Sequence, residues 1–189
     1  MPTPPRLVYL TGPMGSGKST VGARLADVLG TRFVDLDWLV EARTGRTVAE
    51  LFADGGERAF RVAEAGALAE TTRGEAAVVA TGGGTLANAA NLGTAQAAGA
   101  VVWLRPSLGA LAERLGRSRT ARPLLAGPDG RPLAGSALRE RVRAVLDARE
   151  PFYAQADVVV DADGPPDAVA RTVAAALRDW QRAPTAGGT

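Results

Sequence analysis

The fold is decided by Gly12-Pro13-Met14-Gly15-Ser16-Gly17-Lys18-Ser19-Thr20. This stretch fits the pattern G-x-x-x-x-G-K-[ST], in which backbone N–H groups of a glycine-rich loop surround nucleotide phosphates. Lys18 is the only lysine among the 22 lysine and arginine residues of the chain. A compact ammonium can follow a phosphoryl group where a wide, planar guanidinium would not fit. The match around Lys18 argues against the alternative that one lysine survived by chance in an arginine-rich chain.

The residues on either side of this loop have the patterns of a strand and a helix. Leu7–Leu10 is a short apolar run, typical of a buried parallel strand. After the loop, apolar residues recur at helical spacing before a candidate cap at Gly30: Val21, Leu25, Val28 and Leu29. A helix that begins at the loop adds the partial positive charge of its N-terminus. The segment therefore predicts a phosphate-binding strand–loop–helix unit.

The composition is that of an ordinary globular protein. The chain has 189 residues, of which 46% are hydrophobic and 22% are charged. Its net charge is only +2 and it has no run of basic residues, so the sequence does not indicate a nucleic-acid partner. Cysteine and histidine are absent, so a general base has to be a carboxylate or a bound group. No apolar run reaches membrane-spanning length and no leader precedes the first strand, so we expect a cytoplasmic protein. No large apolar stripe is left over, so we expect a monomer.

Apolar strand candidates alternate with helical patterns along the chain. The expected strands are Leu7–Leu10, Arg32–Asp35, Ala76–Thr81, Ala100–Leu104 and Asp157–Val160. The expected helices lie near 18–29, 37–44, 47–53, 57–72, 88–97, 107–116, 136–149 and 166–181. This alternation predicts an α/β domain, with a parallel sheet covered on both faces. We expect one domain over residues 1–182 and a disordered tail over residues 183–189.

Residues 117–135 interrupt the alternation. They are rich in arginine, glycine and proline and carry few large apolar side chains. Two interpretations stay open: a mobile lid that closes over a nucleotide, or an ordinary linker with solvated arginines.

Two carboxylates end the second expected strand. Asp35 and Asp37 are two residues apart, so on a strand they point the same way, at the sheet edge where the glycine loop lies. One carboxylate can help to hold hydrated Mg²⁺ and the other can accept a proton from an incoming hydroxyl. The alternative is a strand-end turn or a helix cap.

Charged pairs and glycines further along the chain suggest a second binding subsite. Arg61 and Glu64 share a helix face, either as a surface ion pair or as a guanidinium that binds a substrate carboxylate and is held by Glu64. Gly82, Gly83 and Gly84 follow a buried strand, which lets the backbone approach a ligand closely.

Another candidate anion ligand lies near the end of a later helix. Arg149 either complements the helix dipole or provides a second contact to an anion. Pro151 follows it, and we expect the helix to stop there.

Taken in order, these segments resemble the shikimate kinase family over nearly the whole chain. The resemblance rests on Gly17-Lys18-Ser19-Thr20, Asp35-x-Asp37, Gly56-Glu57-x-x-Phe60-Arg61-x-x-Glu64, Gly82-Gly83-Gly84, Arg122-Pro123-Leu124-Leu125 and Arg149-x-x-x-Tyr153. The phosphate loop is generic, whereas the elements around Arg61, Arg122 and Arg149 are specific to that family. The resemblance implies a three-layer αβα P-loop kinase fold with a five-stranded parallel sheet. It also implies a substrate-binding region near residues 36–64 and a lid near 117–135.

The resemblance further implies transfer of the γ-phosphoryl group of ATP to the 3-hydroxyl of shikimate, in aromatic amino-acid biosynthesis. On the nucleotide side, the implied phosphate ligands are Gly15, Ser16, Gly17, Lys18, Ser19 and Thr20, joined by Arg122 from the lid. Ser19 would ligate Mg²⁺, and Asp35 would assist through water. Lys18 and Arg122 would then both stabilise the transferred group.

On the acceptor side, the resemblance implies that Asp37 binds shikimate hydroxyls and serves as the base. Arg61 and Arg149 would bind the shikimate carboxylate, with Glu64 orienting Arg61. The glycines at 82–84 would line the site, with a backbone contact from Gly83.

The adenine pocket departs from the family pattern. The stretch between Arg114 and Arg122 is about one residue longer than in familiar members, so either Arg114 or Arg117 could stack on the base. Two alternatives of the same class, a gluconate kinase and a nucleoside-monophosphate kinase, share the loop and the lid. A non-catalytic nucleotide-binding regulatory module is the alternative of another class, and Asp37, Arg61 and Arg149 argue against it.

Overall fold

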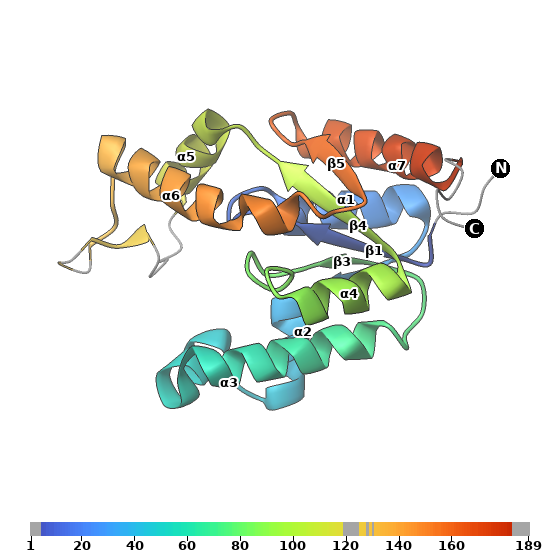
Figure 1. Cartoon of the computed structure of the whole chain (residues 1–189), viewed down its shortest axis with the longest axis horizontal. Coiled ribbons are helices and arrows are strands. Elements are labelled where there is room, and N and C mark those ends of the chain that lie inside the picture. Colours follow the sequence, from blue (N-terminus) through green and yellow to red (C-terminus); the bar gives the residue numbers. More distant parts are fainter. Residues whose placement is uncertain (1–4, 119–124, 128, 130, 183–189) are drawn as a thin grey trace.

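The computed structural model describes residues 5–118, 125–127, 129 and 131–182. Its centre is a five-stranded sheet in the order β2-β3-β1-β4-β5, in which every neighbouring pair is parallel (Figure 1). The strands are β1 (Leu7–Thr11), β2 (Arg32–Asp35), β3 (Ala77–Ala80), β4 (Ala100–Arg105) and β5 (Val158–Asp161). The expected five-stranded parallel sheet is confirmed, and no strand end differs from the expected one by more than one residue.

Helices cover both faces of this sheet (Figure 1). They are α1 (Lys18–Leu29), α2 (Leu36–Thr44), α3 (Val48–Thr71), α4 (Ala89–Ala98), α5 (Leu108–Arg117), α6 (Gly135–Tyr153) and α7 (Pro166–Arg182). α1 and α7 pack on one face, and α2, α3 and α4 pack on the other. In the described part of the chain, no helix combines the length and the apolar character that crossing a bilayer requires.

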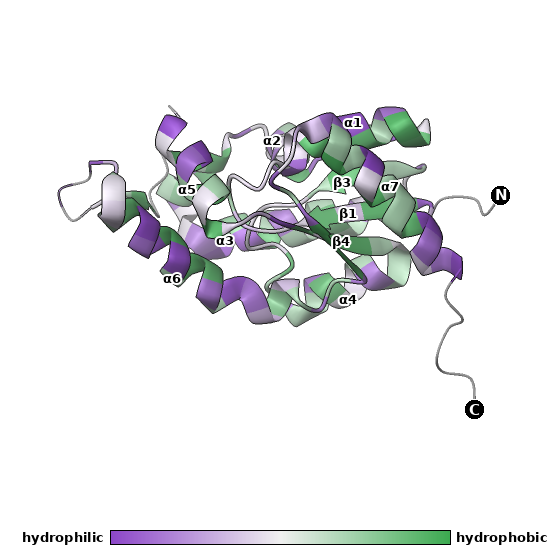
Figure 2. Cartoon of the chain, turned by 90° about the horizontal axis from the view of Figure 1, so that it is seen from above, coloured by the Kyte–Doolittle hydropathy of each residue, from purple (hydrophilic) through white to green (hydrophobic). Residues whose placement is uncertain are grey.

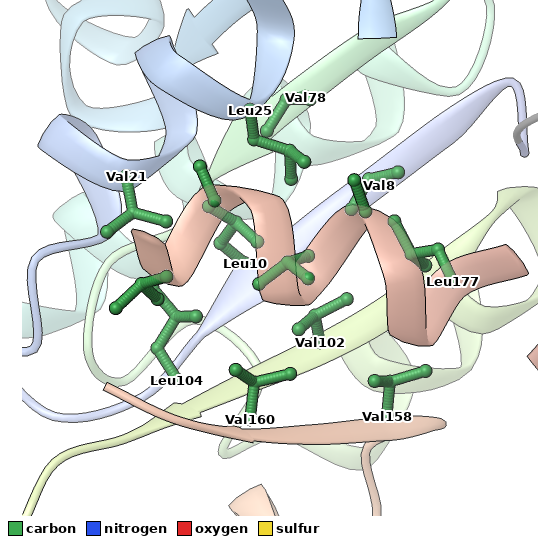
Figure 3. Packing of buried hydrophobic residues seen from close by; sticks show 14 of the residues in the cluster. Val8, Leu10, Val21, Leu25, Val78, Val102, Leu104, Val158, Val160 and Leu177 are labelled. Carbon is green, nitrogen blue, oxygen red and sulfur yellow. The ribbon is translucent and has the colours of Figure 1, made fainter. Parts of the chain in front are cut away.

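Two buried clusters, one on each face, hold the layers together. Alternate residues of β1 contribute to both, because successive side chains of a strand point to opposite faces. Val8 and Leu10 pack with α1 and α7, as Figure 3 shows, whereas Leu7 and Tyr9 pack with the opposite layer. Hydrophobic residues are concentrated in the central strands, and hydrophilic ones follow the outer surface of α6 (Figure 2). Each fully buried valine or leucine contributes roughly 1.5–3 kcal/mol.

The two helices expected at 47–53 and 57–72 are confirmed as the two parts of α3, which non-helical backbone at Gly56 (φ 64°) separates. One helix prediction needs correction. The prediction that the helix carrying Arg149 stops at Pro151 is wrong, because α6 continues to Tyr153. Proline removes one N–H donor from its turn, but the buried Tyr153 side chain holds that turn from outside the helix.

The strand order brings the candidate site residues to one edge of the sheet. β2 ends at Asp35, β3 ends directly before Thr81 and the glycines, and β1 runs into the phosphate loop. These three strands are neighbours, so their carboxyl ends lie side by side. Open parallel sheets bind ligands at this edge, next to the point where the strand order reverses.

Candidate functional site

The phosphate loop joins β1 to α1. Gly17, the residue before the helix, has a left-handed backbone (φ 93°) that side-chain-bearing residues rarely adopt. No side chain of the described residues caps the first helical N–H groups. The Lys18 ammonium folds back on its own loop and donates to the carbonyls of Gly12 (2.8 Å) and Pro13 (2.9 Å). A longer contact joins it to the buried Ser16 hydroxyl (3.4 Å). The loop thus offers an uncapped helix N-terminus and a cation to an anion.

Ser19 and Asp35 meet beside this loop. The Ser19 hydroxyl donates to one Asp35 carboxylate oxygen at 2.7 Å, and the other oxygen accepts from the backbone N–H of Asp37 at 3.1 Å. Asp35 is therefore also the N-cap of α2, which is one of the alternatives considered for this residue. A hydroxyl next to a carboxylate suits Mg²⁺, which takes oxygen ligands and keeps several waters. The residues present fit that ion.

Asp37 has an unusual environment for a carboxylate. Its Oδ1 atom is buried and has no hydrogen-bond partner among the described residues. Burial and then the neighbouring carboxylates of Asp35 and Glu64 together raise the pKa of Asp37 to about 6, although Lys18 opposes them. A buried acceptor without a donor points to a group that a bound ligand supplies.

A cavity of about 350 Å³ connects these features. It is lined by Met14, Gly15, Gly17, Lys18, Ser19, Thr20, Asp35, Asp37, Thr81, Gly82 and Gly83. The candidate residues of the nucleotide side and of the acceptor side therefore line the same cavity. Arg61 and Arg149 do not line it. A larger cavity of about 640 Å³ lies between α5 and α6 and contains none of the predicted site residues.

The glycines at 82–84 lie against the acceptor-side candidates. A Cβ atom at Gly82 would approach Glu64 Oε1 to 2.8 Å and Asp37 Oδ1 to 3.6 Å. A Cβ atom at Gly84 would lie 2.9 Å from Arg61 Nη2. The absence of side chains here leaves room for these charged groups to approach the backbone.

Arg149 approaches the same glycines from α6. A Cβ atom at Gly83 would lie 3.4 Å from Arg149 Nη1 and 3.4 Å from the backbone nitrogen of Met14 in the phosphate loop. The Tyr153 hydroxyl, one helical turn after Arg149, donates to the Gly83 carbonyl at 2.6 Å. Arg61 and Arg149 are therefore brought to adjacent positions of one loop, although they are far apart in the sequence.

The pair of Arg61 and Glu64 is not a surface ion pair. Arg61 Nη1 donates to Glu64 Oε2 at 2.8 Å, and the Glu64 side chain is 0% exposed. Two further contacts belong to residues for which the sequence suggested no role. Thr85 donates to Glu64 Oε1 at 2.6 Å, and Glu57 accepts from Arg61 at 3.0 Å. The i, i+4 spacing of Glu57 and Arg61 was a usable signal, whereas no local pattern predicts the Thr85 contact.

These carboxylates fix the charge and the orientation of Arg61. Burial alone would lower the pKa of Arg61, but Glu64 and then Glu57 raise it above its ordinary value. A guanidinium that is bonded on two edges has a defined plane, as planar recognition of a carboxylate requires.

The structure distinguishes the two arginines considered for the adenine side. Arg114 donates to the backbone carbonyls of Ala162 (2.7 Å) and Asp163 (3.2 Å), in the loop after β5. Arg117 pairs with Glu113 at 2.7 Å and is 80% exposed. Arg122, the expected lid residue, lies outside the described residues, as does the tail at 183–189.

Comparison with known proteins gives the family. A sequence model described as shikimate kinase matches residues 14–178. The chain belongs to the shikimate kinase family. The shikimate kinase of Symbiobacterium thermophilum is 47% identical over 150 residues, which cover 79% of this chain and 82% of that protein. The shikimate kinase of Chlorobaculum tepidum is 41% identical over 157 residues, or 83% and 82% of the two chains.

Solved structures support the same assignment. The shikimate kinase of Acinetobacter baumannii, in complex with shikimate, is 33% identical, covers 94% of each chain and has a TM-score of 0.81. As a member of the shikimate kinase family, the chain is an enzyme that uses ATP as co-substrate. The alternatives of a gluconate kinase, a nucleoside-monophosphate kinase and a non-catalytic module are not favoured.

Proposed function

We propose that this chain transfers the γ-phosphoryl group of ATP to the 3-hydroxyl of shikimate, giving shikimate 3-phosphate and ADP. One observation carries the proposal: a buried carboxylate oxygen of Asp37, for which the described residues provide no hydrogen-bond donor, shares a cavity with the phosphate loop. A hydroxyl donor placed there would satisfy that oxygen and lie next to the transferred phosphate. The relative from Acinetobacter baumannii, whose structure contains shikimate, supports this choice of acceptor.

On the nucleotide side, the loop from Gly15 to Thr20 binds the phosphates through backbone N–H groups, and Lys18 turns from its loop carbonyls to the phosphoryl oxygens. Ser19 and Asp35 are the residues that would hold Mg²⁺. Such an ion would supply positive charge next to the transferred phosphoryl group. Arg122 adds a positive charge from the lid near 117–135.

Arg114 is the better candidate for the adenine side. Its guanidinium is anchored on the loop after β5, which places it at the same sheet edge as the phosphate loop. The exposed Arg117 pairs with Glu113 of its own helix, a contact that does not hold it against the sheet edge.

On the acceptor side, Arg61 and Arg149 bind the shikimate carboxylate from either side of the glycines at 82–84. Asp37 accepts hydrogen bonds from the shikimate hydroxyls. As the 3-hydroxyl oxygen forms its bond to the γ-phosphorus, the bond from that phosphorus to the bridging oxygen of ADP breaks, and the hydroxyl proton passes to Asp37. A loose transition state of this kind needs positioning and positive charge more than a strong base, so the missing histidine is no handicap.

The test is an ADP-release assay with shikimate, gluconate and AMP as separate acceptors. We expect turnover with shikimate alone, and absence of shikimate-dependent ADP release would remove the proposal. Arg61→Ala should raise the KM for shikimate, because it removes one side of the carboxylate contact. Arg58→Ala, which changes an exposed arginine of the same helix, is the matched control and should leave the KM unchanged.

We further propose that the chain acts as a monomer in the cytoplasm and that residues 1–182 form one domain. Sedimentation of the purified chain with and without ATP checks the first point, and a dimer at assay concentrations would contradict it.

A further inference from the structure

Tyr153 is the last residue of the motif Arg149-x-x-x-Tyr153, and the proposed reaction assigns it neither a binding nor a catalytic role. Its ring is 1% exposed, and its hydroxyl donates to the Gly83 carbonyl at 2.6 Å across 70 residues of sequence. One helical turn separates it from Arg149, so both side chains leave α6 on the same face. The nearby Arg149 guanidinium opposes the increase that burial causes in the pKa of Tyr153.

The loop that Tyr153 contacts needs a restraint from outside. Gly82, Gly83 and Gly84 have no side chains that could pack against the rest of the protein. Glycine also loses more backbone conformational freedom on folding than any other residue. Two backbone bonds close the turn locally, from Thr85 to the Gly82 carbonyl and from Ala87 to the Gly84 carbonyl, each at 3.2 Å. The Gly83 carbonyl between them is bonded by Tyr153 instead.

Fixing that carbonyl also fixes the next N–H group. The peptide between Gly83 and Gly84 is planar and trans, so its C=O and N–H point in opposite directions. A carbonyl turned toward Tyr153 therefore turns the Gly84 N–H away from α6. A single hydroxyl thus sets the orientation of the peptide that lies between Arg149 and Arg61.

Tyr153 is itself held against the nucleotide side. Its ring packs on Trp103 of β4, with ring centroids 5.8 Å apart. Trp103 is paired with Thr11, the residue before the phosphate loop, and its Cδ1 edge would lie 3.4 Å from a Cβ atom at Gly12. The two aromatic rings form a rigid connection between the start of the phosphate loop and the acceptor-side glycines.

We propose that Tyr153 is a positioning residue for the acceptor: its hydroxyl fixes the peptide between Gly83 and Gly84 and thereby the spacing of the glycine loop from Arg149. This inference rests on the proposed function, because it assigns the glycine loop to acceptor binding. The competing explanation is that Tyr153 only fills space in the core.

Tyr153→Phe separates the two explanations, since it keeps the ring and removes only the hydroxyl. We expect about a tenfold increase in the KM for shikimate, because the half-buried Gly83 carbonyl loses its donor and the loop loses its orientation. The KM for ATP should stay within about twofold. Tyr9→Phe is the matched control. Tyr9 is the other tyrosine of the chain, is 0% exposed, and bonds Thr71 at 3.0 Å in the opposite layer.

Hydrogen–deuterium exchange of the ligand-free chains gives a readout that does not depend on turnover. The amides of Thr85 and Ala87 should exchange about tenfold faster in Tyr153→Phe than in Tyr9→Phe, because the turn that they close is no longer restrained. Equal exchange in the two variants, or an unchanged KM for shikimate in Tyr153→Phe, would overturn the proposal. If the parent chain fails to phosphorylate shikimate, the proposed function falls, and the exchange data alone decide whether Tyr153 restrains the loop.

Discussion

Asp37, the proposed base, lies in surroundings that are unfavourable for a carboxylate. The carboxylate is partly buried next to two others and has one oxygen without a donor among the described residues. A residue chosen for stability alone would carry no charge here. Perturbed carboxylates of this kind are common at catalytic sites, where charge is arranged for a substrate and not for the free protein.

Replacing Asp37 with asparagine should stabilise the protein. The native pKa of about 6 exceeds the ordinary 3.8, so between these values the folded state binds more protons than the unfolded state. The contribution of Asp37 to stability is therefore most favourable below about pH 4 and is lost as the pH rises to 6. At pH 8, Asp37→Asn should gain on the order of 2 kcal/mol, or roughly 4–8 °C in Tm.

The control for this measurement is Asp179→Asn, whose side chain is 78% exposed. Thermal unfolding of both variants at pH 4 and pH 8 checks the prediction. A gain for Asp37→Asn that is the same at both pH values would contradict the linkage argument.

Turnover should follow the ionisation of the same carboxylate. Asp37 accepts the hydroxyl proton only when it is ionised, so kcat/KM for shikimate should rise with pH and reach a plateau above about pH 6, which reports the free enzyme. Asp37→Asn should lower kcat by about 10²–10⁴-fold and leave the Kd for ATP unchanged. Equal losses of turnover and ATP binding would indicate a folding role.

At the scale of elements, local signals placed almost every strand and helix, because they depend on neighbours within a few residues. The hydrophobic repeat predicted α1 as observed, from Lys18 to Leu29. Pro151 led to a wrong prediction of the helix end. The local preference of proline is overridden there by the hydrogen bond between Tyr153 and Gly83, which are 70 residues apart. Gly56 did mark the break in α3 between the two expected helices.

The capping box of α3 gives a test of an element without a change in the site. Thr47 Oγ1 accepts from the Glu50 N–H at 3.2 Å, and the Glu50 carboxylate accepts from the Thr47 N–H at 2.7 Å. Thr47→Ala should cost about 1 kcal/mol and lower the Tm by roughly 2–4 °C, with the KM for shikimate unchanged. Thr172→Ala, whose hydroxyl bonds a carbonyl within α7, should not lower the Tm.

At the scale of the whole molecule, the proposed acceptor subsite depends on distant segments that meet at the glycines. Gly84→Ala tests this meeting point. Its Cβ atom would lie 2.9 Å from Arg61 Nη2, the flexible end of a side chain, so the guanidinium should shift while the fold survives. We expect the KM for shikimate to rise about tenfold, which is the effect of one weakened charged contact.

Gly93→Ala is the control in helix α4, because no atom of the part of the chain that the structure describes lies within 4 Å of its added Cβ atom, apart from its own helix backbone and chain neighbours. It should stabilise the chain by about 0.5–1 kcal/mol without kinetic change. An unchanged KM in Gly84→Ala would show that Arg61 does not need its present place against the glycines.

The sequence by itself determined the elements, the phosphate loop and the chemical groups available to the site. It could do so because helix and strand periods, caps and loop glycines act over a few residues. Only the tertiary structure decided which groups meet: Arg61 and Arg149 with the glycines at 82–84, Thr85 with Glu64, and Arg114 with the loop after β5. Contacts across tens of residues depend on strand order and layer packing, and no local spacing encodes them.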